Sequence, residues 1–292
     1  MDSLTKYWSD VKPHFRFLKE VLQQTPRTDV EKMIGSKLAR EVFDPFMINE
    51  SAEFLRLSII NLLGYKHVIC GKYLAWGKVT LYYSEFYIIN CLLRLKGFAL
   101  VHLDFLDDDP LVIRIDRTKD NRGYGVQKCG ASGHAIAWKR FSELYPDLFG
   151  SSKELKKLIK NYWQFSMEER ADWCYDLKYA SQTTGKYALI EAEDRCKHNF
   201  LDPDFGVSST AGEGEYYENL MSSLGFEEAG TGDYQKHAIN CLAAIGKNSE
   251  HRAWYCSFFE SILKDLRVLS SSEKTKNEIA KWVEGAITQL KQ

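Results

Sequence analysis

Arg195 and His198 are three residues apart at the end of a helix predicted over 186–198. Two side chains at that spacing share one helix face. A guanidinium can stabilise charge that develops on a phosphate, and an imidazole can transfer a proton near neutral pH. The pair is therefore our candidate catalytic site for RNA processing, or a phosphate-binding site. The alternative is a helix C-terminus whose cations interact favourably with the helix dipole.

Further basic side chains form two groups that could contact nucleic-acid phosphates. Lysines recur at helical spacing on a predicted helix, and more cations lie on a predicted β-hairpin. The lysines are Lys153, Lys156, Lys157 and Lys160, and the hairpin cations are Arg114, Arg117, Arg122 and Lys128. Tyr124, on the same hairpin, could stack on a base. A solvated helix face is the alternative for the lysines, since leucine and isoleucine fill the opposite side.

Motifs for metals and cofactors are weak, and we expect neither. The acidic residues at 104 and 107–109 could hold Mg²⁺, but an Asp-Asp-Asp-Pro context is more typical of an exposed turn. The seven cysteines are odd in number and form no C-x-x-C pair, which favours reduced thiols. No glycine-rich nucleotide loop matches a known spacing.

Charge is nearly balanced overall, at a formal net of −1, but it is unevenly distributed. Residues 114–160 hold 11 basic and 5 acidic side chains, whereas residues 199–233 hold 8 acidic and no basic ones. The separation predicts one positive face and one negative segment. The N-terminus has no apolar signal-peptide core, and no apolar run approaches the length of a membrane span. We expect a cytoplasmic protein with no membrane partner.

The elements that must position these residues are mostly helical. Residues 79–96 are apolar on nearly every face, which predicts a helix buried at the centre of a bundle. Its polar exceptions, Ser84, Glu85, Asn90 and Arg94, must find buried partners. An N-terminal apolar stripe broken by Pro13 predicts a kink or two short helices. A capping box at 28–31 predicts a second helix, and residues 51–63 predict a third that ends at Gly64.

After the central helix the period changes. Residues 98–103, 111–116 and 122–128 predict the strands of a hairpin, and the helical period resumes after Gly133. Helices are expected near 155–162, 167–179 and 186–198, followed by an acidic, glycine-rich loop over 199–233. The segment from 234 to 290 predicts two or three further helices.

The segment Leu81-Tyr-Tyr-Ser-Glu-Phe-Tyr-Ile-Ile-Asn-Cys-Leu-Leu-Arg-Leu-Lys-Gly97 resembles the central helix of HEPN-superfamily proteins. Gly133-His-Ala-Ile-Ala-Trp-Lys-Arg-Phe141 resembles the segment that opens the next helix of that family, and Asp194-Arg-Cys-Lys-His-Asn-Phe200 resembles the ending of the fourth. The resemblance covers about residues 50–200. It implies a mainly α fold: a HEPN-like helical bundle with a small β-hairpin insertion and additional C-terminal helices. It also implies structural roles for five residues: Tyr83, Phe86, His134, Trp138 and Asn199.

HEPN ribonucleases pair an Arg-x(4–6)-His motif across a homodimer, and this chain departs from that spacing. Arg94 and His102 have seven residues between them, and Arg195 and His198 have two. The resemblance therefore leaves catalysis open between a metal-independent ribonuclease and a non-catalytic module.

The expected organisation is N-terminal helices over 1–48, a HEPN-like bundle over 49–200 with the hairpin inserted at about 98–128, a linker over 201–233 and C-terminal helices over 234–292. Two functional hypotheses follow from the resemblance. In the first, the protein belongs to a prokaryotic defence or toxin–antitoxin system, binds RNA in preference to DNA, and acts on it as an enzyme or toxin in a homodimer, with Arg195 and His198 at the site. In the second, it is a non-catalytic interaction subunit of a larger defence complex, held by protein partners from the same operon.

Overall fold

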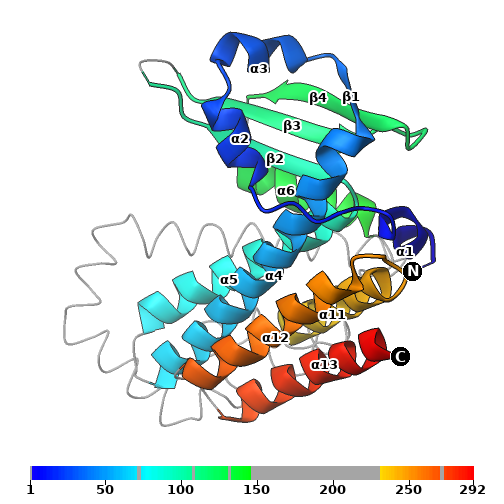
Figure 1. Ribbon diagram of the computed structural model, residues 1–292. Helices are drawn as coiled ribbons and strands as arrows, with labels where there is room; N and C mark the ends of the chain where they lie inside the picture. Colours follow the sequence, from blue (N-terminus) through cyan, green and yellow to red (C-terminus); the bar gives the residue numbers. More distant parts are fainter. Residues whose placement is uncertain (1, 71–73, 107–108, 131–132, 146–230, 270–272) are drawn as a thin grey trace, which may run out of the picture.

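The computed structural model describes residues 2–70, 74–106, 109–130, 133–145, 231–269 and 273–292. In this part of the chain, nine helices accompany one four-stranded antiparallel sheet, which confirms a mainly helical protein with a small β element. The sheet lies at one end of the molecule and the long helices lie at the other (Figure 1).

Three short helices precede the first strand: α1 (Asp2–Trp8), α2 (Leu18–Gln24) and α3 (Arg27–Met33). Because α1 and α2 are separate, the prediction of two short helices around Pro13 is confirmed. The predicted capping box at 28–31 is wrong. The helix begins at Arg27, and Glu31 accepts a hydrogen bond from the Arg27 Nε at 2.8 Å rather than one from the backbone.

Helices α4 (Arg40–Cys70) and α5 (Leu74–Leu95) run side by side in opposite directions through the molecule (Figure 1). The predicted helix end at Gly64 is wrong, because α4 continues beyond it to Cys70. A Cβ at Gly64 would lie 3.3 Å from the Thr80 Cγ2 on α5. This glycine therefore allows close packing of α4 on α5, a role that its residue type alone cannot distinguish from capping. The expected boundary at 48–49 also falls inside α4.

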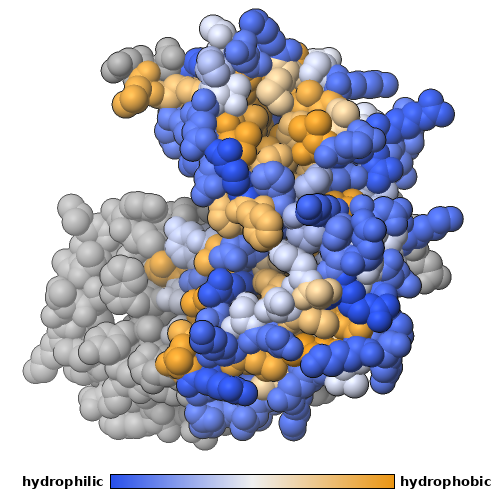
Figure 2. Space-filling model, viewed as in Figure 1, coloured by the Kyte–Doolittle hydropathy of each residue, from blue (hydrophilic) through white to orange (hydrophobic). Residues whose placement is uncertain are grey.

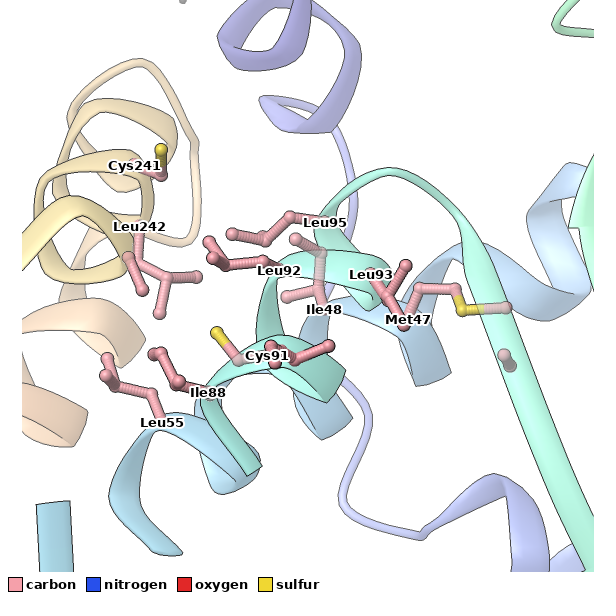
Figure 3. Close-up of a cluster of buried hydrophobic side chains, with 14 of the residues drawn as sticks. Met47, Ile48, Leu55, Ile88, Cys91, Leu92, Leu93, Leu95, Cys241 and Leu242 are labelled. Carbon is pink, nitrogen blue, oxygen red and sulfur yellow. The ribbon is translucent and has the colours of Figure 1, made fainter. Parts of the chain in front are cut away.

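The central position of α5 is confirmed. Its side chains interleave with those of α4 and α11 in the main apolar core, where Leu55, Ile88, Leu92 and Leu242 lie together (Figure 3). Phe86 and Tyr83, which we expected at structural positions, are only half-buried, and Tyr82 is the buried tyrosine of this run.

The sheet has the strand order β1-β4-β3-β2, with every neighbouring pair antiparallel. Strands β2 (Phe98–Leu103), β3 (Leu111–Arg117) and β4 (Gly123–Cys129) confirm the predicted strands. Strand β1 (Lys37–Ala39) was not predicted, since three residues are too short to show alternation. A Cβ at Gly123 would lie 2.5 Å from the Leu38 carbonyl oxygen, so a glycine is needed where β1 joins β4.

The two faces of the sheet differ in burial. The inner face packs against α2 and the start of α4, and α3 lies beside its β4 edge (Figure 1). Its apolar side chains are buried: Val101, Ile113, Ile115 and Val126. The outer face carries half-buried and exposed side chains, among them Leu100, His102, Arg114 and Gln127. Helix α6 (Gly133–Leu144) follows β4 and places Arg140 against Asp116 at one end of this outer face, with 2.9 Å between the Arg140 Nη2 and the Asp116 Oδ1.

Three C-terminal helices complete the described chain, as predicted: α11 (Thr231–Lys247), α12 (Arg252–Val268) and α13 (Glu273–Lys291). Helix α11 contacts α4 and α5, and α13 packs on α11 and α12. The helices predicted near 155–162, 167–179 and 186–198, and the acidic segment up to residue 230, lie outside the described residues. Each of the described helices is either too short or too polar to span a membrane.

Leu92→Ala should lower the free energy of unfolding by about 2–5 kcal/mol, because Leu92 is fully buried in the main core and its truncation leaves a cavity. Leu106→Ala is the matched control: the same side chain is 93% exposed and should change stability by less than about 0.5 kcal/mol. Urea denaturation followed by circular dichroism measures both. Equal losses in the two variants would contradict the central position of α5.

Candidate functional site

Several of the predicted site residues lie outside the described chain. They are the catalytic pair Arg195 and His198, the lysines Lys153, Lys156, Lys157 and Lys160, and the structural residue Asn199. His134 lies in the first turn of α6, and Trp138 on the same helix is buried, as expected of a structural residue. The predicted hairpin cations are all within the described residues, and their positions decide where a ligand could bind.

The hairpin cations do not share one surface. Arg117 extends from the inner face of the sheet and is only 12% exposed. Its guanidinium lies 3.1 Å from the centroid of the Tyr7 ring and donates a hydrogen bond to the Tyr124 hydroxyl at 3.1 Å. The prediction that Arg117 contacts phosphates is therefore wrong, as is base stacking by Tyr124, which is completely buried. Alternation along β3 places Arg117 and Arg114 on opposite faces.

Asp44 is the carboxylate around which the Arg117 region is organised. Its Oδ1 accepts hydrogen bonds from the Tyr7 and Tyr124 hydroxyls, each at 2.7 Å. Its Oδ2 accepts two more from Arg40, at 3.1 Å from Nε and 3.0 Å from Nη2. Four donors thus satisfy one buried carboxylate. No local pattern in the sequence predicts this cluster, because its members come from α1, α4, β3 and β4.

The two tyrosines of this cluster are hydrogen-bond donors over the whole physiological pH range. Burial, followed by the hydrogen bond to Asp44, raises the pKa of Tyr7 to about 12. Burial likewise raises the pKa of Tyr124 far above its ordinary value. A phenol that stays protonated cannot act as a base at neutral pH, so the Asp44 cluster is suited to holding elements together rather than to proton transfer.

Glu50 and Arg94 form a second buried polar cluster, at the end of α5. The Arg94 Nε lies 2.6 Å from the Glu50 Oε2, and both side chains are less than 10% exposed. The other Glu50 oxygen accepts the backbone N–H of Leu18 at 2.7 Å, and the Arg94 Nη1 donates to the Phe98 carbonyl at 3.1 Å. Arg94 therefore has the buried partner that we expected for a charged residue in an apolar helix. It is buried, whereas His102, the histidine that follows it in the sequence, is exposed.

A cysteine and a histidine on α11 lie as close together as in a nucleophilic site, but the cysteine is not ionised at neutral pH. The Cys241 Sγ lies 3.5 Å from the His237 Nε2. Burial raises the pKa of Cys241 to about 11, and burial together with the charge of Lys96 lowers the pKa of His237. At neutral pH the pair is therefore a thiol beside a neutral imidazole, whereas a reactive cysteine must be a thiolate.

The exposed cations of this region lie along the β1–β4 side of the sheet and in the β3–β4 turn. Lys37 pairs with Gly125 on the outer face, whereas Lys128 pairs with Ile113 and extends from the opposite face, beyond the residues of β4 that pair with β1. We call the set of Lys37, Lys119, Arg122 and Lys128 the cationic edge; all four are exposed, and none forms an ion pair with a described residue. In Figure 1 the β3–β4 turn projects beyond the rest of the sheet, and Figure 2 shows a hydrophilic surface there. Of the predicted phosphate-binding residues, Arg122 and Lys128 belong to this edge. Lys37 and Lys119 were not among them.

Electrostatics connects part of the cationic edge. The pKa of Asp120 in the β3–β4 turn is lowered, chiefly by the Thr118 hydroxyl and the Arg122 backbone N–H that bond to it, and further by the charges of Lys37 and Arg122. Lys37 pairs with Gly125 of β4, so it stands next to the strand that Arg122 precedes. Lys37 and Arg122 therefore both lie close enough to Asp120 for their charges to act on it.

Arg114 is held differently from these free cations. It lies on the outer face, bonded to Asp116, with its guanidinium 5.5 Å from the centroid of the Phe98 ring. Arg140 bonds the same Asp116 and also Glu143, each at 2.9 Å, so the two guanidiniums are neutralised by two carboxylates. The contribution of Arg114 to any binding surface is a fixed, planar group rather than an unpaired charge.

No group of three or more potential metal-ligating side chains occurs among the described residues. Of the acidic turn considered for Mg²⁺, residues 107 and 108 lie outside the described residues, and the Asp104 Oδ2 lies 3.4 Å from the Lys19 Nζ. Comparison with models of known families, with curated proteins and with solved structures finds no significant match to this chain. The HEPN resemblance accordingly stays a prediction carried by its motifs.

Arg94→Met should lower the free energy of unfolding by about 3–5 kcal/mol, because it leaves the Glu50 charge buried without its partner. Adding Glu50→Gln should restore much of the loss, since the amide oxygen can still accept the Leu18 N–H. Lys32→Met, which breaks the exposed pair with Asp29, is the control and should cost less than about 1 kcal/mol. Urea melts of the four proteins measure this, and a double variant no more stable than Arg94→Met would contradict it.

Cys241 should resist alkylation by iodoacetamide in the native protein at pH 7.5, because its thiol is 2% exposed and its pKa is near 11. Unfolding in urea should expose it to rapid modification. Peptide mass spectrometry locates the label, with the partly exposed Cys256 as the internal reference. Labelling of Cys241 as fast as Cys256 in the folded protein would show that the Cys241–His237 pair is reactive after all.

Proposed function

We propose that this chain is a nucleic-acid-linked, HEPN-like protein of a prokaryotic defence or toxin–antitoxin system, and that it binds RNA phosphates through the cationic edge. The supporting observation is the set of four exposed cations along the β1–β4 edge and the β3–β4 turn, none of them paired with a described carboxylate. The HEPN-like identity and the biological system come from the motif resemblance.

The physical case for phosphate binding is the contrast between two classes of cation. Internal carboxylates and aromatic rings bind the guanidiniums of the first class, which are Arg40, Arg94, Arg117 and Arg140. The cationic edge forms no ion pair with a described residue, and Asp120 in the turn offsets only part of its charge. A phosphate backbone can therefore neutralise these cations and release its own condensed counterions. A net charge of −1 for the whole chain makes this local excess the feature that would orient an approaching RNA.

Catalysis under this proposal would lie with Arg195 and His198, as a metal-independent ribonuclease site. In the described part of the chain, the one cysteine–histidine pair with a contact distance is uncharged at neutral pH, and the Asp44 tyrosines stay protonated. The described residues thus support binding, and the chemical step is assigned to the Arg195–His198 segment by the resemblance.

A non-catalytic interaction subunit of a larger defence complex is the second candidate function. Phe15 is 85% exposed and Leu106 is 93% exposed. Aromatic side chains such as Phe15 are enriched in the cores of protein interfaces. Phe15 follows His14, whose ring lies 4.5 Å from that of Phe46 on α4, so it is presented beside a fixed element. Native mass spectrometry of the complex formed at natural expression levels distinguishes this function from RNA binding.

Lys37→Glu/Lys119→Glu/Arg122→Glu should weaken binding to a single-stranded RNA. For every phosphate that the variant no longer neutralises, the slope of log K against log salt should become shallower by about 0.7. Fluorescence anisotropy with a labelled 12-nucleotide RNA, titrated at several salt concentrations, measures affinity and slope together.

The matched control reverses three exposed cations of the C-terminal helices, Lys264→Glu/Arg267→Glu/Lys281→Glu. It changes net charge by the same amount and should leave the salt slope unaltered. If both triple variants lose affinity equally, binding follows overall charge rather than the cationic edge. If wild type binds neither RNA nor DNA at low salt, the interaction-subunit function takes precedence.

A further inference from the structure

The outer face of the sheet carries a compact block of accessible side chains next to the cationic edge. Cross-strand pairing aligns six residues in two rows of three, and all six are half-buried or exposed. One row is Leu100, Arg114 and Gln127, and the next is His102, Val112 and Cys129. Helix α6 meets this face at the Phe98 end, beyond the first row. We call these six residues the sheet platform.

The dimensions of the sheet platform follow from strand geometry. Neighbouring strands lie about 4.8 Å apart, and alternate residues along a strand about 6.7 Å apart, so the six Cα positions span about 10 Å by 7 Å. One or two planar nucleobases cover an area of that size. A folded protein partner would normally require a much larger contact.

Apolar and polar groups alternate across the sheet platform. Leu100, Val112 and Cys129 supply apolar surface, and burial raises the pKa of the Cys129 thiol, which keeps it uncharged. Gln127 and His102 are exposed, and their side chains form no hydrogen bond with any described residue. The amide and imidazole groups can therefore bond to base edges, while the apolar groups contact base faces.

Arg114 adds a fixed planar cation between these groups. Its bond to Asp116 and its position over the Phe98 ring, 5.5 Å from the centroid, limit the orientations of the guanidinium. It is flanked in its row by Leu100 and Gln127. Guanidinium planes are surfaces on which unstacked bases pack, so a pre-oriented Arg114 would lose little freedom on binding.

The sheet platform and the cationic edge are continuous. Lys37 pairs with Gly125, and Gly125 pairs with Asp116 of the outer face, so Lys37 stands on this same face. Gln127 is two residues farther along β4, diagonal to Lys37. A chain whose phosphates lie at Lys37 can thus place its next bases over the row that contains Gln127 and Arg114.

We propose that the sheet platform is a recognition surface for the bases of single-stranded RNA. This inference depends on the proposed function, in which the adjacent cationic edge holds the phosphates. Duplex RNA does not offer the same contacts, because its base faces are stacked on one another and its Watson–Crick edges are paired, whereas single-stranded bases can be splayed out onto the platform. A protein partner is disfavoured because the platform lacks the aromatic anchors that dominate protein interfaces.

The test uses the full chain and the variant His102→Ala/Gln127→Ala, with fluorescence anisotropy on 12-nucleotide homopolymers of RNA and on a blunt RNA duplex. Affinity for the preferred homopolymer should fall by about 5- to 150-fold, the range expected when base-edge hydrogen bonds are removed. The salt slope and the weak duplex binding should not change, because the phosphate contacts are intact. Asn240→Ala, an exposed amide on α11, is the matched control and should bind like wild type.

A second measurement locates the bases directly. A 4-thiouridine-substituted RNA, crosslinked by ultraviolet light to the wild-type protein, should modify peptides from β2 or β4. Equal affinities of wild type and His102→Ala/Gln127→Ala for every homopolymer, with crosslinks elsewhere, would overturn the sheet platform while leaving the cationic edge in place. Binding of the duplex as tightly as the single strand would also overturn it. Failure of wild type to bind any RNA at low salt would overturn both proposals.

Discussion

The buried ion pair between Glu50 and Arg94 is the interaction on which the rest of the structure depends. One side chain from α4 and one from α5 meet at 2.6 Å, and their remaining groups bond the first turn of α2 and the first residue of β2. Two buried charges are costly unless both are fully partnered, so these four elements must meet in one arrangement. The pair thereby fixes where the helical layer ends and the sheet begins.

A second carboxylate of α4, Asp44, repeats this device nearer the sheet. It gathers Arg40 and two tyrosine hydroxyls, and Arg117 packs against the same tyrosines, which ties α1 and two strands to α4. The internal cations form ion pairs and ring contacts that hold the fold together, whereas the cations of the β1–β4 edge form no ion pair with a described residue. The two groups of cations therefore have different roles. An arginine held between a carboxylate and an aromatic ring has few free N–H donors for a ligand, whereas an unpaired surface lysine keeps its full attraction for phosphate.

The proposed activities occupy the part of the sheet that the helices leave open. Helix α2 and the start of α4 pack on its inner face (Figure 1), whereas the side chains of its outer face and of the β1–β4 edge are accessible. A rigid sheet holds side chains at regular intervals, which suits a repetitive polymer such as single-stranded RNA. Phosphate contacts at the edge and base contacts on the face would then divide affinity and selectivity between two adjacent surfaces.

The sequence alone determined the elements with strong periodicity. The central helix at 79–96, the three main strands and the C-terminal helices all follow from patterns of apolar residues, because burial of one face imposes such patterns locally. Because the helix is otherwise apolar, the sequence also predicted that Ser84 and Arg94 have buried partners. It did not predict which residues these are, and the structure shows Ser58 and Glu50. Only the tertiary structure decided the uses of Gly64, Arg117 and Lys37. Gly64 is a packing contact rather than a helix end, Arg117 points inward, and Lys37 lies in a three-residue strand that forms only by pairing with β4. Each depends on residues far away in the chain, and a contact between distant segments leaves no periodic trace in either one.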